Sequence, residues 1–315
     1  MFNDIKSNYI LKKIIRDNLD KKIYLSIAKY NKKLQNKIGL NLENYKEYSN
    51  RIFNRTEMEL IPYSHLKPDI KYYFIRRKEN RAYYHIYFDE DKKEINRTYI
   101  TNADNVKKIY IKIDMELKSL KGLFYKCEAL KEVKFTKFNR EDFTDLCETF
   151  NECIYLDKLD VTKFKTSKVT KMNWMFTRCE SLQELNILNF DTSNVTEMMC
   201  LFSGCKRLKE LNFKFNTKNV INMRNMFFEC RSLKKIDISN FDTTNLKYFS
   251  EMFYNCISLD KLDNNIVNFF NLHFADYSRM FGGCNETLKA YIRKKCAIKE
   301  DSNNSDNGIF DTRFY

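Results

Sequence analysis

Apolar residues recur with a fixed period through the last two thirds of the chain. Seven cysteines are separated by 26, 26, 26, 25, 26 and 28 residues, each has a Phe three positions earlier, and the first six have a Leu three positions later. These cysteines are Cys127, Cys153, Cys179, Cys205, Cys230, Cys256 and Cys284. Such a period indicates a supersecondary unit stacked on copies of itself. Because a single unit cannot bury its apolar side alone, we expect the fixed positions to face a shared core.

Each unit contains a short segment with the pattern of a half-buried strand. The segments LQELNI (182–187) and LKKIDI (233–238) end with alternating apolar and polar residues. Stacked in register, one such strand per unit would form a parallel sheet with neighbours about 4.8 Å apart. The segments FDTSN and FDTTN predict tight corners without glycine, because Asp, Thr, Ser and Asn bond to the local backbone. The segment VTEMMCLF would return the chain as a short strand or a helical turn.

The strand alternation predicts which side chains face outward. If the positions six and eight after each periodic cysteine are buried, the positions five and seven after it must be exposed. We name the position-five residues the first outer file: Glu132, Lys158, Glu184, Glu210, Lys235 and Lys261. The second outer file, at position seven, comprises Lys134, Asp160, Asn186, Asn212, Asp237 and Asp263. These twelve residues are the predicted partner-binding face, although a merely solvated face would have the same pattern.

The region before the repeats has a different pattern. Apolar residues at helical spacing between Ile5 and Leu40 predict two helices, with Asp20 as a possible cap between them. Aromatic and β-branched runs at 70–77, 82–94, 97–100 and 106–113 predict strands that cover the open end of the stack. After Cys284 the segment LKAYIRKKCAIK breaks the period and is expected to cap the other end, before a solvated tail.

The sequence therefore predicts an α/β repeat solenoid, similar to a leucine-rich repeat, with about one parallel strand per 26-residue turn. We expect a helical module at 1–50, a β-rich linker and N-terminal cap at 51–117, the repeats at 118–292, and a C-terminal cap and tail at 293–315.

The chain is basic, and its charge is uneven. The net charge of +14 divides into +11 for residues 1–121, with 27 Lys and Arg against 16 Asp and Glu, and +3 for the remainder. This excess suggests contact with nucleic acid or an anionic membrane surface through the first third of the chain. The alternative is a compositional bias in which lysines keep the helices soluble, and the sequence favours this alternative because no Arg-rich block or nucleic-acid motif occurs.

No motif for catalysis, a cofactor or a metal occurs in the sequence. The histidines His65, His85 and His273 lie in unrelated contexts, and there is no phosphate-binding loop or G-x-G-x-x-G segment. Zinc sites use close cysteine pairs such as C-x2-C, and none is present. We therefore expect a protein that is not an enzyme and needs no cofactor or metal, with the periodic cysteines as reduced, small apolar core residues.

The joint pattern F-x2-C-x2-L with N-F-D-T-S-N-V resembles the BspA-type leucine-rich repeat family, which includes mycoplasma lipoproteins and many protist proteins. The resemblance covers residues 118–292 and implies a non-catalytic repeat protein used for adhesion or protein binding, often at the cell surface. The segment from Ile5 to Leu40 resembles the F-box, which implies an adaptor of a ubiquitin ligase.

The chain shows no signal-peptide pattern at its start and no window approaching about 18 uncharged apolar residues, so we expect a cytoplasmic protein. We expect a non-catalytic intracellular scaffold that binds a protein partner through the outer files. The alternatives are an F-box-like adaptor, a BspA-type surface adhesin, and a binder of nucleic acid or a membrane surface.

Overall fold

The computed structural model describes residues 54–76, 83–91, 93–114, 119–262, 266–270 and 279–296. Contacts divide the chain into two units, Met1–Arg55 and Thr56–Tyr315. The predicted helical module at 1–50, with its F-box resemblance, and the predicted tail after residue 296 lie outside the described residues. Nearly all of the described residues therefore lie in the second unit, Thr56–Tyr315.

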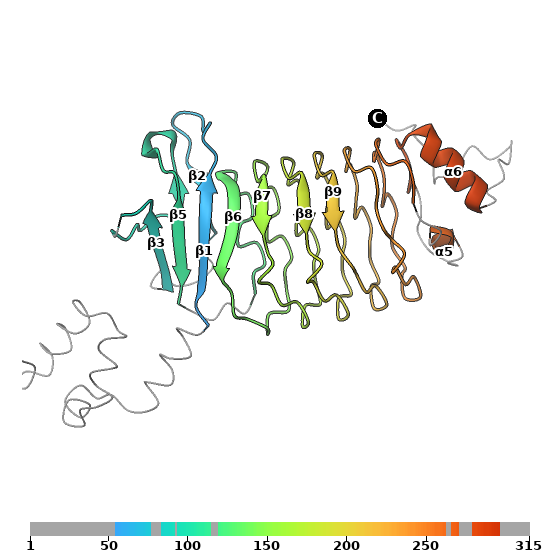
Figure 1. The fold of residues 1–315 in the computed structure, drawn as a ribbon, viewed down its shortest axis with the longest axis horizontal. Coiled ribbons are helices and arrows are strands. Elements are labelled where there is room, and N and C mark those ends of the chain that lie inside the picture. Colours follow the sequence, from blue (N-terminus) through green and yellow to red (C-terminus); the bar gives the residue numbers. More distant parts are fainter. Residues whose placement is uncertain are drawn as a thin grey trace, which may run out of the picture. The chain divides into compact units, whose positions relative to one another are not determined.

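A mixed five-stranded sheet begins the second unit (Figure 1). Its strands are ordered β3-β5-β1-β6-β7, where β1 is Thr56–Pro62, β3 is Tyr84–Phe88, β5 is Ile109–Ile113, β6 is Leu130–Lys137 and β7 is Lys158–Asp160. All pairs are antiparallel except β6 with β7. Alternate residues of β1 and β5 are buried, as expected for strands with one face on the core. Strands β2 (Tyr72–Tyr73) and β4 (Tyr99–Ile100) form a separate pair, and the 3-10 helix η3 (Asn102–Asp104) follows β4.

The repeats follow the sheet in chain order. Strands β8 (Glu184–Asn186) and β9 (Glu210–Asn212) form a parallel pair, and Lys235 makes an isolated parallel bridge to Lys261. Strands β6, β7, β8 and β9 lie side by side along one face (Figure 1). The return arms also meet through single parallel bridges, which join Asp145, Lys171, Glu197, Asn222 and Tyr248 in succession. The return arm thus contributes one bridge residue per repeat, and turns occupy most of the rest.

The predicted class, an α/β repeat solenoid, is wrong. The described residues form mainly β structure around a mixed sheet, and their helices are confined to the short η3, α5 (Ile266–Phe270) and α6 (Glu286–Cys296). No continuous parallel sheet runs through the described repeats, because β7 completes the mixed sheet whereas β8 and β9 pair separately. The physical reason is that β7, β8 and β9 are each three residues long, so turns and corners make up most of each unit.

Two files of side chains fill the core between the repeats. The ring file consists of Phe124, Phe150, Phe176, Phe202, Phe227, Phe253 and Phe281, stacked nearly parallel with successive centroids 5.3–5.8 Å apart. The periodic cysteines form the thiol file, and all seven are buried and free. From Cys153 onward, each Sγ donates a hydrogen bond at 3.0–3.2 Å to the carbonyl oxygen of the ring-file Phe in the preceding repeat, so that Cys153 donates to Phe124. A thiol at this position therefore both fills space and satisfies a backbone acceptor.

Polar ladders hold the corners of the repeats. Thr166, Thr192 and Thr217 are buried, and each hydroxyl donates to a backbone carbonyl of the next repeat at 2.9 Å. At the same corner, the side-chain amides of Asn194, Asn219 and Asn245 donate to carbonyls of the preceding repeat at 2.7 Å. These bonds explain how FDTSN-type segments turn the chain without glycine.

The helix α6 ends the described region. The Asn285 side chain accepts a hydrogen bond from the Leu288 backbone N–H at 2.8 Å, so Asn285 caps the first turn. The α6 residues Leu288 and Ile292 are buried on one face, and the helix contacts α5. No helix among the described residues is long and apolar enough to cross a membrane.

Candidate functional site

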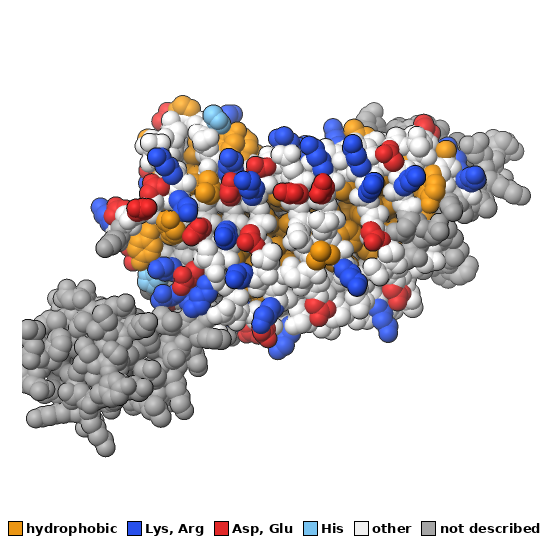
Figure 2. Space-filling model, viewed as in Figure 1, with side chains coloured by type: hydrophobic (Ala, Val, Ile, Leu, Met, Phe, Trp, Pro, Cys, Tyr) orange, Lys and Arg blue, Asp and Glu red, His pale blue; other side chains and the backbone are white. Residues whose placement is uncertain are grey.

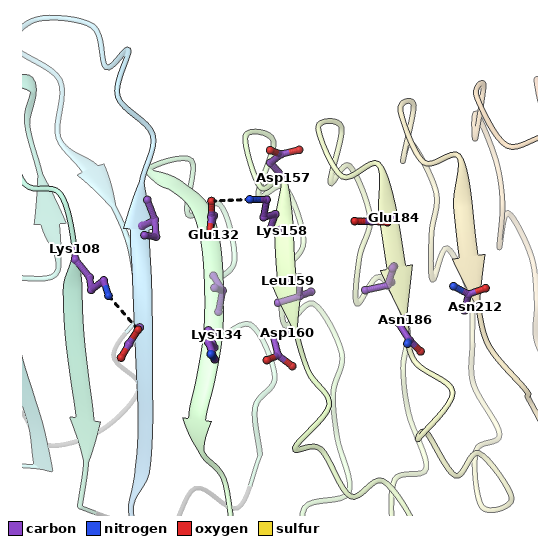
Figure 3. Close-up of a pocket in the computed structure, with 14 residues that line it drawn as sticks. Lys108, Glu132, Lys134, Asp157, Lys158, Leu159, Asp160, Glu184, Asn186 and Asn212 are labelled. Atoms are coloured by element: carbon purple, nitrogen blue, oxygen red, sulfur yellow. Dashed lines mark hydrogen bonds and ion pairs between the residues drawn. The ribbon is translucent and has the colours of Figure 1, made fainter.

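A groove of about 640 Å³ lies over the outer face of the strands, where the mixed sheet meets the repeats (Figure 3). Strands β1, β6, β7, β8 and β9 contribute residues to it, together with the segment before β5. Its lining residues are Glu59, Ile61, Lys108, Glu132, Val133, Lys134, Asp157, Lys158, Leu159, Asp160, Glu184, Leu185, Asn186 and Asn212. Backbone hydrogen bonds join β1 to β6, β6 to β7 and β8 to β9, so the side chains within each of these sheets keep a fixed register.

The structure brings most of the predicted outer-file residues together. Glu132, Lys134, Lys158, Asp160, Glu184, Asn186 and Asn212 all line the groove. Glu210 is exposed beside Glu184 on the neighbouring strand. Lys235, Asp237 and Lys261 are exposed in later repeats, and Asp263 lies outside the described residues.

Ion pairs neutralise the first part of the groove. Glu132 and Lys158 face each other across β6 and β7, with Oε1 3.5 Å from Nζ, as the dashed line in Figure 3 shows. Lys108 donates to Glu59 at 3.3 Å, and this hydrogen bond raises the pKa of the Lys108 ammonium group. These four charged side chains thus have partners on the protein itself.

The next two positions of the first outer file carry like charges. Glu184 and Glu210 are register partners on the parallel strands β8 and β9, and both are exposed. Lys235 and Lys261 are likewise register partners and exposed. Within the part of the chain that the structure describes, none of these four side chains has an oppositely charged group within 4.0 Å. We name Glu184 and Glu210 the carboxylate pair, and Lys235 and Lys261 the lysine pair. Like charges directly opposite each other on neighbouring strands destabilise a sheet.

The second outer file has a structural role that the strand alternation did not predict. The side-chain oxygens of Asp160, Asn186 and Asp237 accept hydrogen bonds from the backbone N–H two residues later, at 3.0, 3.2 and 2.9 Å respectively. Each bond turns the chain out of its strand. The recurrence of Asp or Asn at a strand end was the available signal.

The groove includes residues that the periodic pattern did not indicate. Glu59 and Ile61 come from β1, which pairs antiparallel with β6, and the repeats carry no signal for that neighbour. Val133, Leu159 and Leu185 lie between the two outer files and were expected to be buried; Leu159 is half-buried.

The groove is acidic although the chain is basic. Its lining carries five carboxylates and three lysines, a net charge of −2, in a chain of net charge +14. Figure 2 shows acidic and basic side chains distributed along this face. The arrangement can attract complementary charges at fixed spacing. No group of three or more His, Cys, Asp or Glu side chains that could hold a metal occurs among the described residues.

The fold and groove define a β-rich protein of stacked short repeats with a polar outer face. The chain belongs to the family described as "Mycoplasma protein of unknown function, DUF285", which matches residues 100–185, 118–212 and 183–294. No curated protein and no solved structure matches the chain. The match agrees with the prediction of a mycoplasma-type repeat family.

Proposed function

We propose that this protein is a non-catalytic interaction scaffold that binds another protein through the groove and the adjoining outer files. The observation that carries the proposal is the carboxylate pair, since Glu184 and Glu210 are exposed, adjacent and without a basic partner among the described residues. A sheet that is selected only for stability would alternate these charges, as Glu132 and Lys158 do. A bound partner that supplies basic side chains would remove the repulsion.

The groove also argues against nucleic acid as the partner at this face, because its net charge is negative and phosphates are repelled by carboxylates. The proposal includes kinship with BspA-type repeats, supported by the F-x2-C-x2-L pattern and the mycoplasma family match. Adhesion and intracellular scaffolding both use protein binding, so the groove serves either role.

Affinity capture of the full chain, followed by mass spectrometry, tests the proposal. We compare the wild-type protein with Glu184→Lys/Glu210→Lys and with a matched control, Glu90→Lys/Glu141→Lys, which reverses two exposed carboxylates outside the groove lining. The groove variant should capture at least about tenfold less of the wild-type partner, and the control should capture it normally. Normal capture by the groove variant, with loss on deletion of residues 1–50, would contradict the proposal and assign binding to the N-terminal region.

A further inference from the structure

The repeats advance by about one turn of an α-helix. Successive ring-file centroids are 5.3–5.8 Å apart, and neighbouring parallel strands are about 4.8 Å apart. An α-helix rises about 5.4 Å per turn. A helix that lay along the stack, across the strands, would therefore present one turn to each repeat.

The first outer file offers an ordered set of charges at this spacing. Along the stack, the internally neutralised Glu132 and Lys158 precede the carboxylate pair, and the lysine pair follows it. From Glu184 to Lys261 there are three repeat steps, which span roughly 14–17 Å at the two spacings. Helix positions i, i+4, i+7 and i+11 lie on one face and span about 16.5 Å.

We infer that the groove and the outer files receive a helix of the partner protein that lies along the stack of repeats, an inference that rests on the proposed function. The helix carries two basic side chains one turn apart, facing the carboxylate pair, and two acidic side chains in the next turns, facing the lysine pair. It places apolar side chains over Leu159 and the neighbouring lining residues. Charge complementarity thus fixes its position along the stack.

An extended segment fits this spacing less well. Side chains on one face of a strand recur about every 6.6–6.8 Å, so such a segment would move out of step with the repeats by roughly 1–2 Å at each one. After three repeats the mismatch would reach roughly 3–6 Å, between about half a repeat and a whole one. A helix stays in step over the same distance.

Two displayed peptide libraries test the inference on the immobilised full chain. The first is a 25-residue Ala-rich and Gln-rich helical scaffold in which positions i, i+4, i+7 and i+11 are randomised. The second randomises four positions at the same spacing in an unstructured Gly/Ser host. The wild-type protein should enrich helical clones with Lys or Arg at two neighbouring positions and Asp or Glu at the other two. Selection on Glu184→Lys/Glu210→Lys should instead enrich acidic residues opposite the changed pair, and the wild-type clones should bind this variant at least about tenfold more weakly.

Three outcomes contradict the helix: no enrichment from the helical library, equal recovery from the unstructured library, or helical clones without charge order. If clones of either library then lose binding to the double variant, only the helix inference fails and the groove remains a protein-binding site. If their binding to the double variant is unchanged, the proposed function fails as well.

Discussion

At the residue scale, buried thiols and hydroxyls join each repeat to the next one. The periodic sequence predicted the thiol file as reduced apolar residues, and the structure places all seven thiols in the core as free cysteines. The sequence could not show the hydrogen bonds from Sγ to the Phe carbonyls, because a pattern of buried positions carries no information about donors. These bonds distinguish cysteine from an apolar residue of equal size.

The rate of chemical labelling should distinguish the buried thiol file from partly exposed cysteines. Burial raises the pKa of the thiol-file cysteines, to about 12 for Cys205, so the reactive thiolate is scarce at neutral pH. We expect iodoacetamide at pH 8 to label the partly exposed Cys200 before the thiol file and the thiol file only after denaturation, as measured by peptide mass spectrometry. Rapid native labelling of most of the file, or stoichiometric zinc, would contradict this reading.

The same pKa shifts predict a loss of stability at alkaline pH. A thiol whose pKa is raised in the folded state stays protonated there, whereas in the unfolded chain it ionises near its ordinary value of 9.0. The contribution of these thiols to the free energy of unfolding is therefore fully present below about pH 9, and it is lost as the pH rises toward 12. Urea denaturation between pH 7 and 10.5 should show a declining free energy of unfolding, and a free energy that is flat or rises above pH 9 would contradict the expectation.

The buried threonines make a second test at this scale. The Thr192 hydroxyl donates to the Asn216 carbonyl at 2.9 Å and accepts from the Asn216 N–H at 2.8 Å. Thr192→Val keeps the shape but leaves two backbone groups unsatisfied, so it should destabilise the fold by about 2 kcal/mol. Thr144→Val, at an exposed position, should change stability by less than about 0.5 kcal/mol. If the two substitutions lowered the free energy of unfolding equally in chemical denaturation, the hydrogen bonds of the buried threonines would not stabilise the repeats.

At the element scale, the strands of the earlier repeats were predictable, but the sheets were not, and the predicted strand LKKIDI is reduced to an isolated bridge at Lys235. Alternation in segments such as LQELNI correctly indicated β8 and the exposure of Glu184 and Asn186. It did not indicate that β1 pairs with β6, because that antiparallel contact joins segments with no shared pattern. It also predicted a continuous parallel sheet, which three-residue strands linked by long turns do not form.

The charges on neighbouring strands predict opposite effects of two similar substitutions. Glu184→Gln removes the repulsion within the carboxylate pair, so it should stabilise the protein by about 0.2–0.5 kcal/mol. Its matched control, Glu132→Gln, removes the ion pair with Lys158 and should destabilise the protein by a similar amount. Both effects should shrink in 1 M salt, where the screening length is about 3 Å. Effects of the same sign in urea denaturation would contradict this account of the surface.

At the scale of the whole molecule, the period of the sequence determined which residues share the core and which share the outer face. Seven of the twelve predicted face residues line one groove, because a regular stack converts sequence spacing into spatial proximity. The acidic character of the groove was not predictable from the net charge, since the basic excess of the chain lies largely before residue 122. The predicted fold class and the predicted continuous sheet were wrong for one reason. The spacing of residues in the sequence does not reveal how long each strand is.

Site-specific photo-crosslinking tests directly whether a protein partner contacts the groove. A photoreactive amino acid replaces Asn212, an exposed residue of the groove lining, or Asn240, an exposed residue outside the lining. After irradiation of cells that produce the full chain, we expect a discrete adduct at position 212 and none of the same mass at position 240. An adduct at position 240 alone, or none at position 212 while the partner is still captured, would contradict it.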